Sequence, residues 1–119
     1  DGDWAQVLLA IARGQVPQMK FKPGAAACLV LAAEKYPDDP VKGVLIEGDL
    51  TSLDLGVVFH AGTKLDASKR WVTNGGRVLN VVATGTDVQE ALDKAYARAT
   101  RVGWAKMQLR TDIGKGLLQ

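Results

Sequence analysis

The residues best suited to bind a ligand lie in one short stretch, Asn74-Gly75-Gly76-Arg77. Asn-Gly is typical of a two-residue type I′ hairpin turn, because both central residues of that turn take positive φ. Gly76 lets the backbone approach a neighbour or a ligand closely, and Arg77 carries a planar fork of N–H donors that suits phosphate or carboxylate. The stretch therefore predicts a hairpin whose tip could bind an anion, although an ordinary turn with a solvated arginine explains the same residues.

Lys64 and Arg110 are secondary candidates for the same anion, and each has a plainer explanation. Lys64 follows the turn-forming pair Gly62-Thr63, where a solvated lysine is common. Arg110 precedes Asp112 by two residues and could form a surface ion pair with it, which would contribute little to stability. His60 is the only histidine, so a zinc site fails on the number of ligands. A strand histidine that makes one hydrogen bond is the simpler interpretation.

No catalytic arrangement is visible in the sequence. Cys28 lies in the apolar run Ala25–Ala33, which predicts a buried thiol without a base to activate it. The glycine pair before Arg77 is not a nucleotide-binding phosphate loop, because it leads into a strand and lacks the Lys-Ser/Thr ending. No Ser-His-Asp order and no paired carboxylates occur. The residues themselves predict no catalytic side chain and no metal site.

Composition describes an ordinary globular domain. The 119 residues are enough for one core, 47% of them are hydrophobic and 24% charged, and the net charge is +2. No Lys/Arg cluster is dense enough to follow a nucleic-acid backbone, and no apolar run approaches the length of a membrane span. A single cysteine suits the cytoplasm, where disulfides are rare. The chain opens on Asp1-Gly2-Asp3-Trp4 without Met, so we expect a piece of a longer protein.

The apolar pattern predicts one α+β domain, with an antiparallel sheet and a helix at each end of the sequence. Residues 3–14 form the first expected helix, capped by Asp3 and ended by Gly14, and an extended connector follows to Gly24. The expected strands are 25–33 (buried on both faces), 44–46, 56–61, and the two arms of the Asn74-Gly75 hairpin, 70–73 and 78–83.

The second expected helix is the best specified element. Thr86 is its expected N-cap with Gln89 at the capping-box position, and Gly103 is its expected end. An apolar stripe runs from Val88 to Val102 at helical spacing, while the charged residues, among them Arg98, are assigned to the solvent face. The acids lie near the start and the bases near the end, as the helix dipole favours.

Three motifs occur together in the order and spacing of one known family. They are Val58–Lys64, Val72–Leu79 and Arg110–Gly114, flanked by Lys22–Cys28 and by Tyr36-Pro37 with Lys42-Gly43. On these residues, essentially the whole chain resembles the carboxy-terminal part of the phosphoribosylamine–glycine ligases, also called glycinamide ribonucleotide synthetases. The chain departs from the usual pattern at Lys106 and Leu109, where the family has a small residue and an aromatic one. Those changes bear on local packing.

The resemblance implies an ATP-grasp ligase of purine biosynthesis, in the cytoplasm. Such an enzyme activates the glycine carboxylate as an acyl phosphate with ATP and magnesium (or manganese), and phosphoribosylamine then attacks to form the amide. The implied fold is a rudimentary barrel-sandwich hybrid, with 1–119 a single domain and residues 1–14 a linking helix from the grasp domain. The family's magnesium and nucleotide ligands lie upstream of this chain, so we expect the fragment alone to be inactive and its partners to be the amino-terminal and grasp domains.

The resemblance also implies a role for the candidate site. In related purine ligases, basic residues at the position of Arg77 hold the ribose phosphate of the substrate. The implied site in this chain is Arg77 with the backbone N–H groups of Gly75 and Gly76, and with Asn74 beside them, on the phosphate of phosphoribosylamine. The alternative interpretation is a stand-alone binding or scaffold module with the same fold. A third is the equivalent domain of another ATP-grasp ligase, such as a biotin-dependent carboxylase subunit, and the motifs Asn74–Arg77 and His60–Lys64 argue against it.

Overall fold

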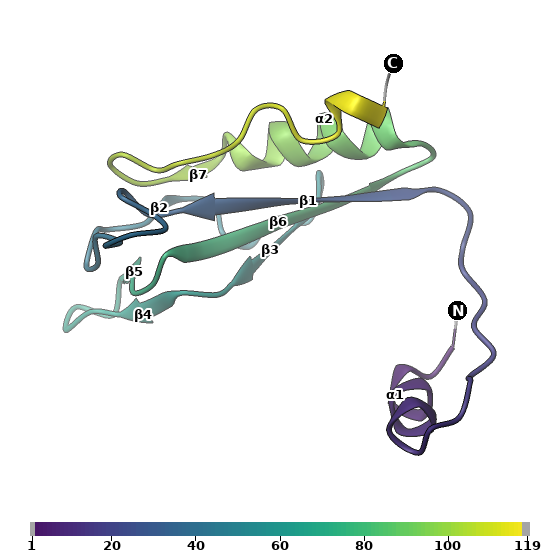
Figure 1. Cartoon of the computed structure of the whole chain (residues 1–119). Helices are drawn as coiled ribbons and strands as arrows, with labels where there is room; N and C mark the ends of the chain where they lie inside the picture. Colours follow the sequence, from purple (N-terminus) through teal and green to yellow (C-terminus); the bar gives the residue numbers. More distant parts are fainter. Residues whose placement is uncertain (1, 118–119) are drawn as a thin grey trace.

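The computed structural model describes residues 2–117, as a sheet-and-helix body with one helix standing apart (Figure 1). The Asp3 carboxylate caps the separate helix, as expected, and the connector after it has neither helix nor strand. No helix in the described part of the chain is long and apolar enough to cross a bilayer. In chain order the elements are α1 (Trp4–Ala12), β1 (Ala25–Ala32), β2 (Glu47–Gly48), β3 (Val57–His60), β4 (Thr63–Leu65), β5 (Trp71–Thr73), β6 (Arg77–Gly85), α2 (Val88–Ala99), β7 (Val102–Gly103) and a 3-10 turn (Lys115–Leu117).

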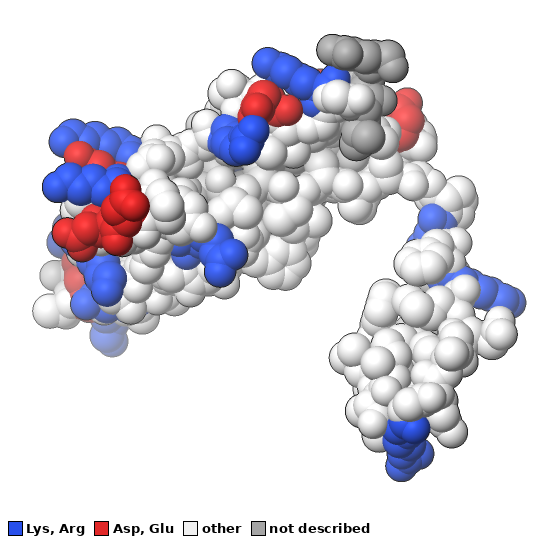
Figure 2. Space-filling view, in the orientation of Figure 1, with Lys and Arg blue, Asp and Glu red and all other residues white. Residues whose placement is uncertain are grey.

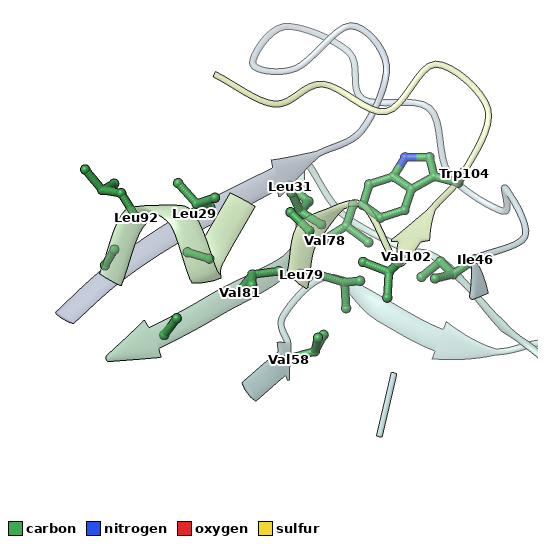
Figure 3. Close-up of a cluster of buried hydrophobic side chains, with 14 of the residues drawn as sticks. Leu29, Leu31, Ile46, Val58, Val78, Leu79, Val81, Leu92, Val102 and Trp104 are labelled. Atoms are coloured by element: carbon green, nitrogen blue, oxygen red, sulfur yellow. The ribbon is translucent and has the colours of Figure 1, made fainter. Parts of the chain in front are cut away.

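The main sheet is antiparallel, with β6 in the centre between β1 and β3. Its register aligns Leu29, Val81 and Val58 across the three strands. These side chains point to the same face, where α2 covers them and forms the core with them (Figure 3). The central position expected for residues 78–83 is confirmed, and so is the α+β class with an antiparallel sheet.

The other face of this sheet is not covered within the described chain, which corrects two expectations. Ala26, Cys28 and Val30 of β1 are exposed while their neighbours Ala27 and Leu29 are buried. The strand is therefore not buried on both faces, and Cys28 is an exposed thiol. The reason is the number of layers: α2 packs on one side only, so alternate residues of an apolar strand stay exposed.

The prediction of a hairpin at Asn74-Gly75 is wrong. β5 pairs with β4, whereas β6 pairs with β1 and β3. Asn74, Gly75 and Gly76 all lack the positive φ that a type I′ turn requires. The glycines serve close packing instead, since a Cβ on Gly76 would lie 2.4 Å from the Tyr36 ring.

Helix α2 begins one residue later and ends earlier than its sequence pattern indicates. Asp87 is the N-cap, its carboxylate accepting from the Glu90 N–H at 2.9 Å, and the Glu90 carboxylate accepts in return from Thr86. This is a capping box one residue beyond the expected one. The helix ends at Ala99, and the next residues form β7, paired with β2.

Arg98 is the clearest correction within α2. Its side chain is fully buried, and its Nη2 donates to the Asp49 carbonyl at 2.8 Å. Its spacing explains the burial, because it lies seven residues after Ala91 and three after Ala95, on the covered side of the helix.

The shorter strands were predicted less well. Residues 44–46 contribute only a single bridge, from Leu45 to Val72, and the strand follows them at β2. Thr63 and Lys64 belong to β4 rather than to a turn. Charged side chains of both signs gather at the end of the body where this β4–β5 hairpin lies (Figure 2).

Candidate functional site

The candidate site is built where three chain segments approach one another. The Gly62 N–H donates to the Arg77 carbonyl at 2.9 Å, and the Gly62 carbonyl accepts from the Asn74 N–H at 2.7 Å. On the other side, the Gly76 carbonyl accepts from the Ala33 N–H at 2.8 Å. The main chain from Asn74 to Arg77 is thus held from both sides before β6 begins.

Glycine is required at these crossings because the backbones almost touch. A Cβ on Gly62 would lie 2.6 Å from the Arg77 carbonyl oxygen and 2.9 Å from the Gly75 Cα. Both atoms belong to the main chain, so a side chain cannot turn aside to make room. Gly62 and Tyr36 are parts of the site that the sequence did not single out as such, and the only signal for either was its place in a family motif.

Arg77 differs from the other arginines of the body in having no acidic partner among residues 2–117. Its side chain is exposed, and no group in the described part of the chain forms an ion pair or a hydrogen bond with it. The four others each lie against an aspartate, in the pairs Arg70–Asp66, Arg98–Asp49, Arg101–Asp54 and Arg110–Asp112. A guanidinium without a carboxylate is available to an anion from outside.

Arg110 lies near the site, but its charge is already engaged. A surface cavity of about 280 Å³ is lined by Tyr36 and Arg110 and also by Ala32, which lies opposite Arg77 in the register. The Asp112 carboxylate is 2.6 Å from the Arg110 Nη2 and raises the pKa of Arg110 above its usual value. The ion pair anticipated from the sequence is confirmed, and it makes Arg110 the weaker anion ligand.

Lys64 and His60 lie beside the segment that ends at Gly62. Lys64 is exposed on β4, two residues beyond the contact between Gly62 and Gly75. The His60 Nδ1 is 3.0 Å from the Thr63 hydroxyl, and its ring packs on Trp71 with centroids 4.2 Å apart. His60 is thus a strand histidine with a local partner.

The arrangement suits anion binding rather than metal chemistry. Neither the Gly75 nor the Gly76 N–H has a backbone or side-chain acceptor within residues 2–117, and Arg77 follows these two residues directly in the chain. Successive N–H groups with a cation are a common way to hold a phosphate. Within the same residues, three or more metal-ligating side chains do not come together anywhere.

Comparison with known proteins places the chain in a family. Residues 26–116 match the family described as "Phosphoribosylglycinamide synthetase, C domain". The chain is 44% identical, over 123 aligned positions, to the phosphoribosylamine–glycine ligase of Caulobacter vibrioides, covering 100% of this chain and 29% of that protein. It is 40% identical over 109 residues to the ligase of the same name from Vigna unguiculata, covering 87% of this chain and 35% of that one.

A solved structure agrees with these sequence relatives. The crystal structure of phosphoribosylamine–glycine ligase from Thermotoga maritima matches with a TM-score of 0.76 and 37% identity, over 92% of this chain and 27% of that one. The chain thus spans about a third or less of the relatives it matches. On the extent of this agreement, the chain belongs to the family of phosphoribosylglycinamide synthetase C domains.

Proposed function

We propose that this chain is the C domain of a phosphoribosylamine–glycine ligase, which joins glycine to 5-phosphoribosylamine with hydrolysis of ATP to ADP and phosphate. The family match over residues 26–116 and the names of the relatives support this proposal. The parent would be an ATP-grasp ligase of the cytoplasm, and its amino-terminal and grasp domains would be the partners of this one. We infer also that the sheet assembly is the rudimentary barrel-sandwich hybrid of such ligases.

The domain's part in the reaction would be to bind substrate. The observation that carries this proposal is the exposed Arg77 without an acidic partner in the described chain, on a main chain held by Gly62 and Ala33. Arg77, with the N–H groups of Gly75 and Gly76, would hold the phosphate of phosphoribosylamine. Asn74, Lys64 and Arg110 lie around these groups as secondary contacts.

The residues of this domain do not fit the cofactors of the reaction. ATP and magnesium (or manganese) would be needed by the whole ligase, where the metal screens the charge of the transferred phosphate. The described residues offer neither a cluster of metal-ligating side chains nor a strand-to-helix phosphate loop. Both cofactors would therefore bind to other domains, and this chain alone would not turn over.

Steady-state kinetics of the full-length ligase would test the proposal. Arg77→Ala should raise the KM for phosphoribosylamine about tenfold or more and leave the KM for glycine unchanged, because a charged hydrogen bond to the phosphate is lost. Arg70→Ala is the matched control: it also removes an exposed arginine, but one bound to Asp66. Equal KM values for phosphoribosylamine in wild type and Arg77→Ala would refute the assignment. If the full-length protein released no ADP that depended on glycine and phosphoribosylamine, the proposed ligase activity would be refuted.

A further inference from the structure

The uncovered side of the main sheet forms a largely apolar surface, here called the open face. The register places its residues in cross-strand rows, in which paired side chains point the same way. Val57 is 37% exposed, Val30 40% and Phe59 52%, which is unusual for large apolar side chains grouped on one face. The rows of the open face are Ala26 and Thr84, then Cys28, Val82 and Val57, then Val30, Asn80 and Phe59.

The open face contains no charged residue, which limits what can bind it. A nucleic acid or an acidic peptide would need lysine or arginine there, whereas Lys94 and Asp54, of opposite sign, lie only at its border, where they line a cavity with Val57. The face suits the apolar centre of a protein interface, where charged residues are depleted.

Helix α1 likewise exposes large apolar side chains that nothing in the described chain covers. Not one of its residues is buried, although Trp4 is 58% exposed, Leu8 62% and Ile11 55%. Figure 1 shows α1 standing off the body, on the side of the sheet away from α2, and Figure 2 shows its visible surface as almost uncharged. A nine-residue helix is marginal on its own and gains its stability from packing.

Helix α1 also lies outside the domain to which the body belongs. The C-domain match begins at residue 26, whereas the relative from Caulobacter vibrioides aligns with 100% of the chain, α1 included. The relative from Caulobacter vibrioides thus contains the segment that forms α1 here, together with the more than two thirds of its length that this chain does not span. The rest of that polypeptide is therefore a candidate partner for both α1 and the open face.

We propose that the open face is the docking surface for the preceding part of the same ligase polypeptide, the part that also receives α1. This inference rests on the proposed function. The surface lies next to Arg77, because β6 carries both, so docking there would bring the phosphate site against the remainder of the enzyme. The domain would then complete a substrate site that lies between domains.

Cys28 reports on this interface, because it lies in the middle row of the open face and is the only cysteine of the chain. The test compares alkylation of its thiol by N-ethylmaleimide, followed by peptide mass spectrometry, in the 119-residue chain and in the full-length ligase. We expect Cys28 to react about tenfold or more slowly in the full-length enzyme, since reaction would first require local opening of the interface. Ala97→Cys, on the exposed side of α2, is the control and should react equally in both.

Ligase activity, measured on the same samples, separates the two proposals. Equal alkylation of Cys28 in the short chain and in an active ligase would overturn the docking surface and leave the function standing. Protection of Cys28 in a full-length protein that lacks ligase activity would support the docking surface and refute the function. Protection that extends to the Ala97→Cys control would also overturn the assignment to the open face.

Discussion

Gly62→Ala tests whether close backbone packing positions the candidate site. The added methyl would lie 2.6 Å from the Arg77 carbonyl oxygen, which is also the acceptor of the Gly62 N–H hydrogen bond. It would meet the Gly75 Cα at 2.9 Å as well. Because both neighbours are main-chain atoms, relief requires the end of β3 and the start of β6 to move apart.

Two effects set the size of the change. Overpacking of this kind costs about 1–3 kcal/mol, and weakening the Gly62–Arg77 hydrogen bond adds about 0.5–1.5 kcal/mol. The free energy of unfolding should therefore fall by about 2–4 kcal/mol. For a domain of this size, that corresponds to a loss of roughly 8–16 °C in Tm.

Thermal unfolding of the 119-residue chain, followed by far-UV circular dichroism, measures the effect. Gly103→Ala is the matched control, because its Cβ would meet its nearest neighbour, the Met107 Cε, at an ordinary 4.0 Å. We expect its Tm to stay within about 2 °C of wild type, as for most changes that add no clash. If Gly62→Ala and Gly103→Ala unfold at the same temperature, the packing argument for the site is wrong.

Two further predictions concern the stability of α2. The pKa of Glu90 is lowered from 4.5 to about 2, mainly by the Lys94 ammonium and then by hydrogen bonds from the N–H and hydroxyl of Thr86. The stability from these contacts is therefore present above pH 4.5 and lost as the pH falls toward 2. In urea titrations, the free energy of unfolding of Glu90→Gln should fall less over that pH range than that of wild type. Parallel pH curves for the two proteins would contradict this. Arg98→Ala should lower the free energy of unfolding by about 2–5 kcal/mol, because it leaves a cavity. Arg98→Met should lower it by at least about 1 kcal/mol less, because methionine fills the space without a buried charge. Equal losses for the two variants in chemical denaturation would rule out the cavity as the cause.

Local patterns in the sequence predicted the helices and strands, but not which other elements pack against them. The cap at Asp3, the apolar run of β1 and the helical spacing of α2 each lie within a few residues, and all three elements are present. Whether β1 has one covered face or two depends on how many layers pack on the sheet, which its own residues do not encode. Cys28 was misplaced for that reason.

Arg98 shows how residue type and position can conflict. Its spacing from Ala91 and Ala95 fits the covered side of α2, whereas its charge favours solvent, and the sequence interpretation assigned it to the solvent face. The acceptor that permits its burial is the carbonyl of Asp49, 49 residues earlier in the chain. A contact at that separation leaves no trace in a helical periodicity, so the sequence alone could not have decided between the two.

The sequence indicated the candidate site through glycines expected in a turn, whereas in the structure these glycines allow close packing. Asn74-Gly75-Gly76 indicated a turn because glycine permits positive φ, but glycine also permits close approach, and the two uses look alike in a sequence. In the structure the glycines fix the main chain beneath Arg77 while its guanidinium stays exposed. A site ordered before binding loses less entropy when its ligand arrives.

Position and charge can therefore be separated by two variants in the full-length ligase. Arg77→Ala removes the charge and leaves the packing of Gly62 intact, so the KM for phosphoribosylamine should rise while the Tm hardly changes. Gly62→Ala keeps the charge and displaces its support, so both quantities should change. If Gly62→Ala lowered the Tm without raising that KM, the packing would serve the fold alone, and the phosphate site would not depend on it.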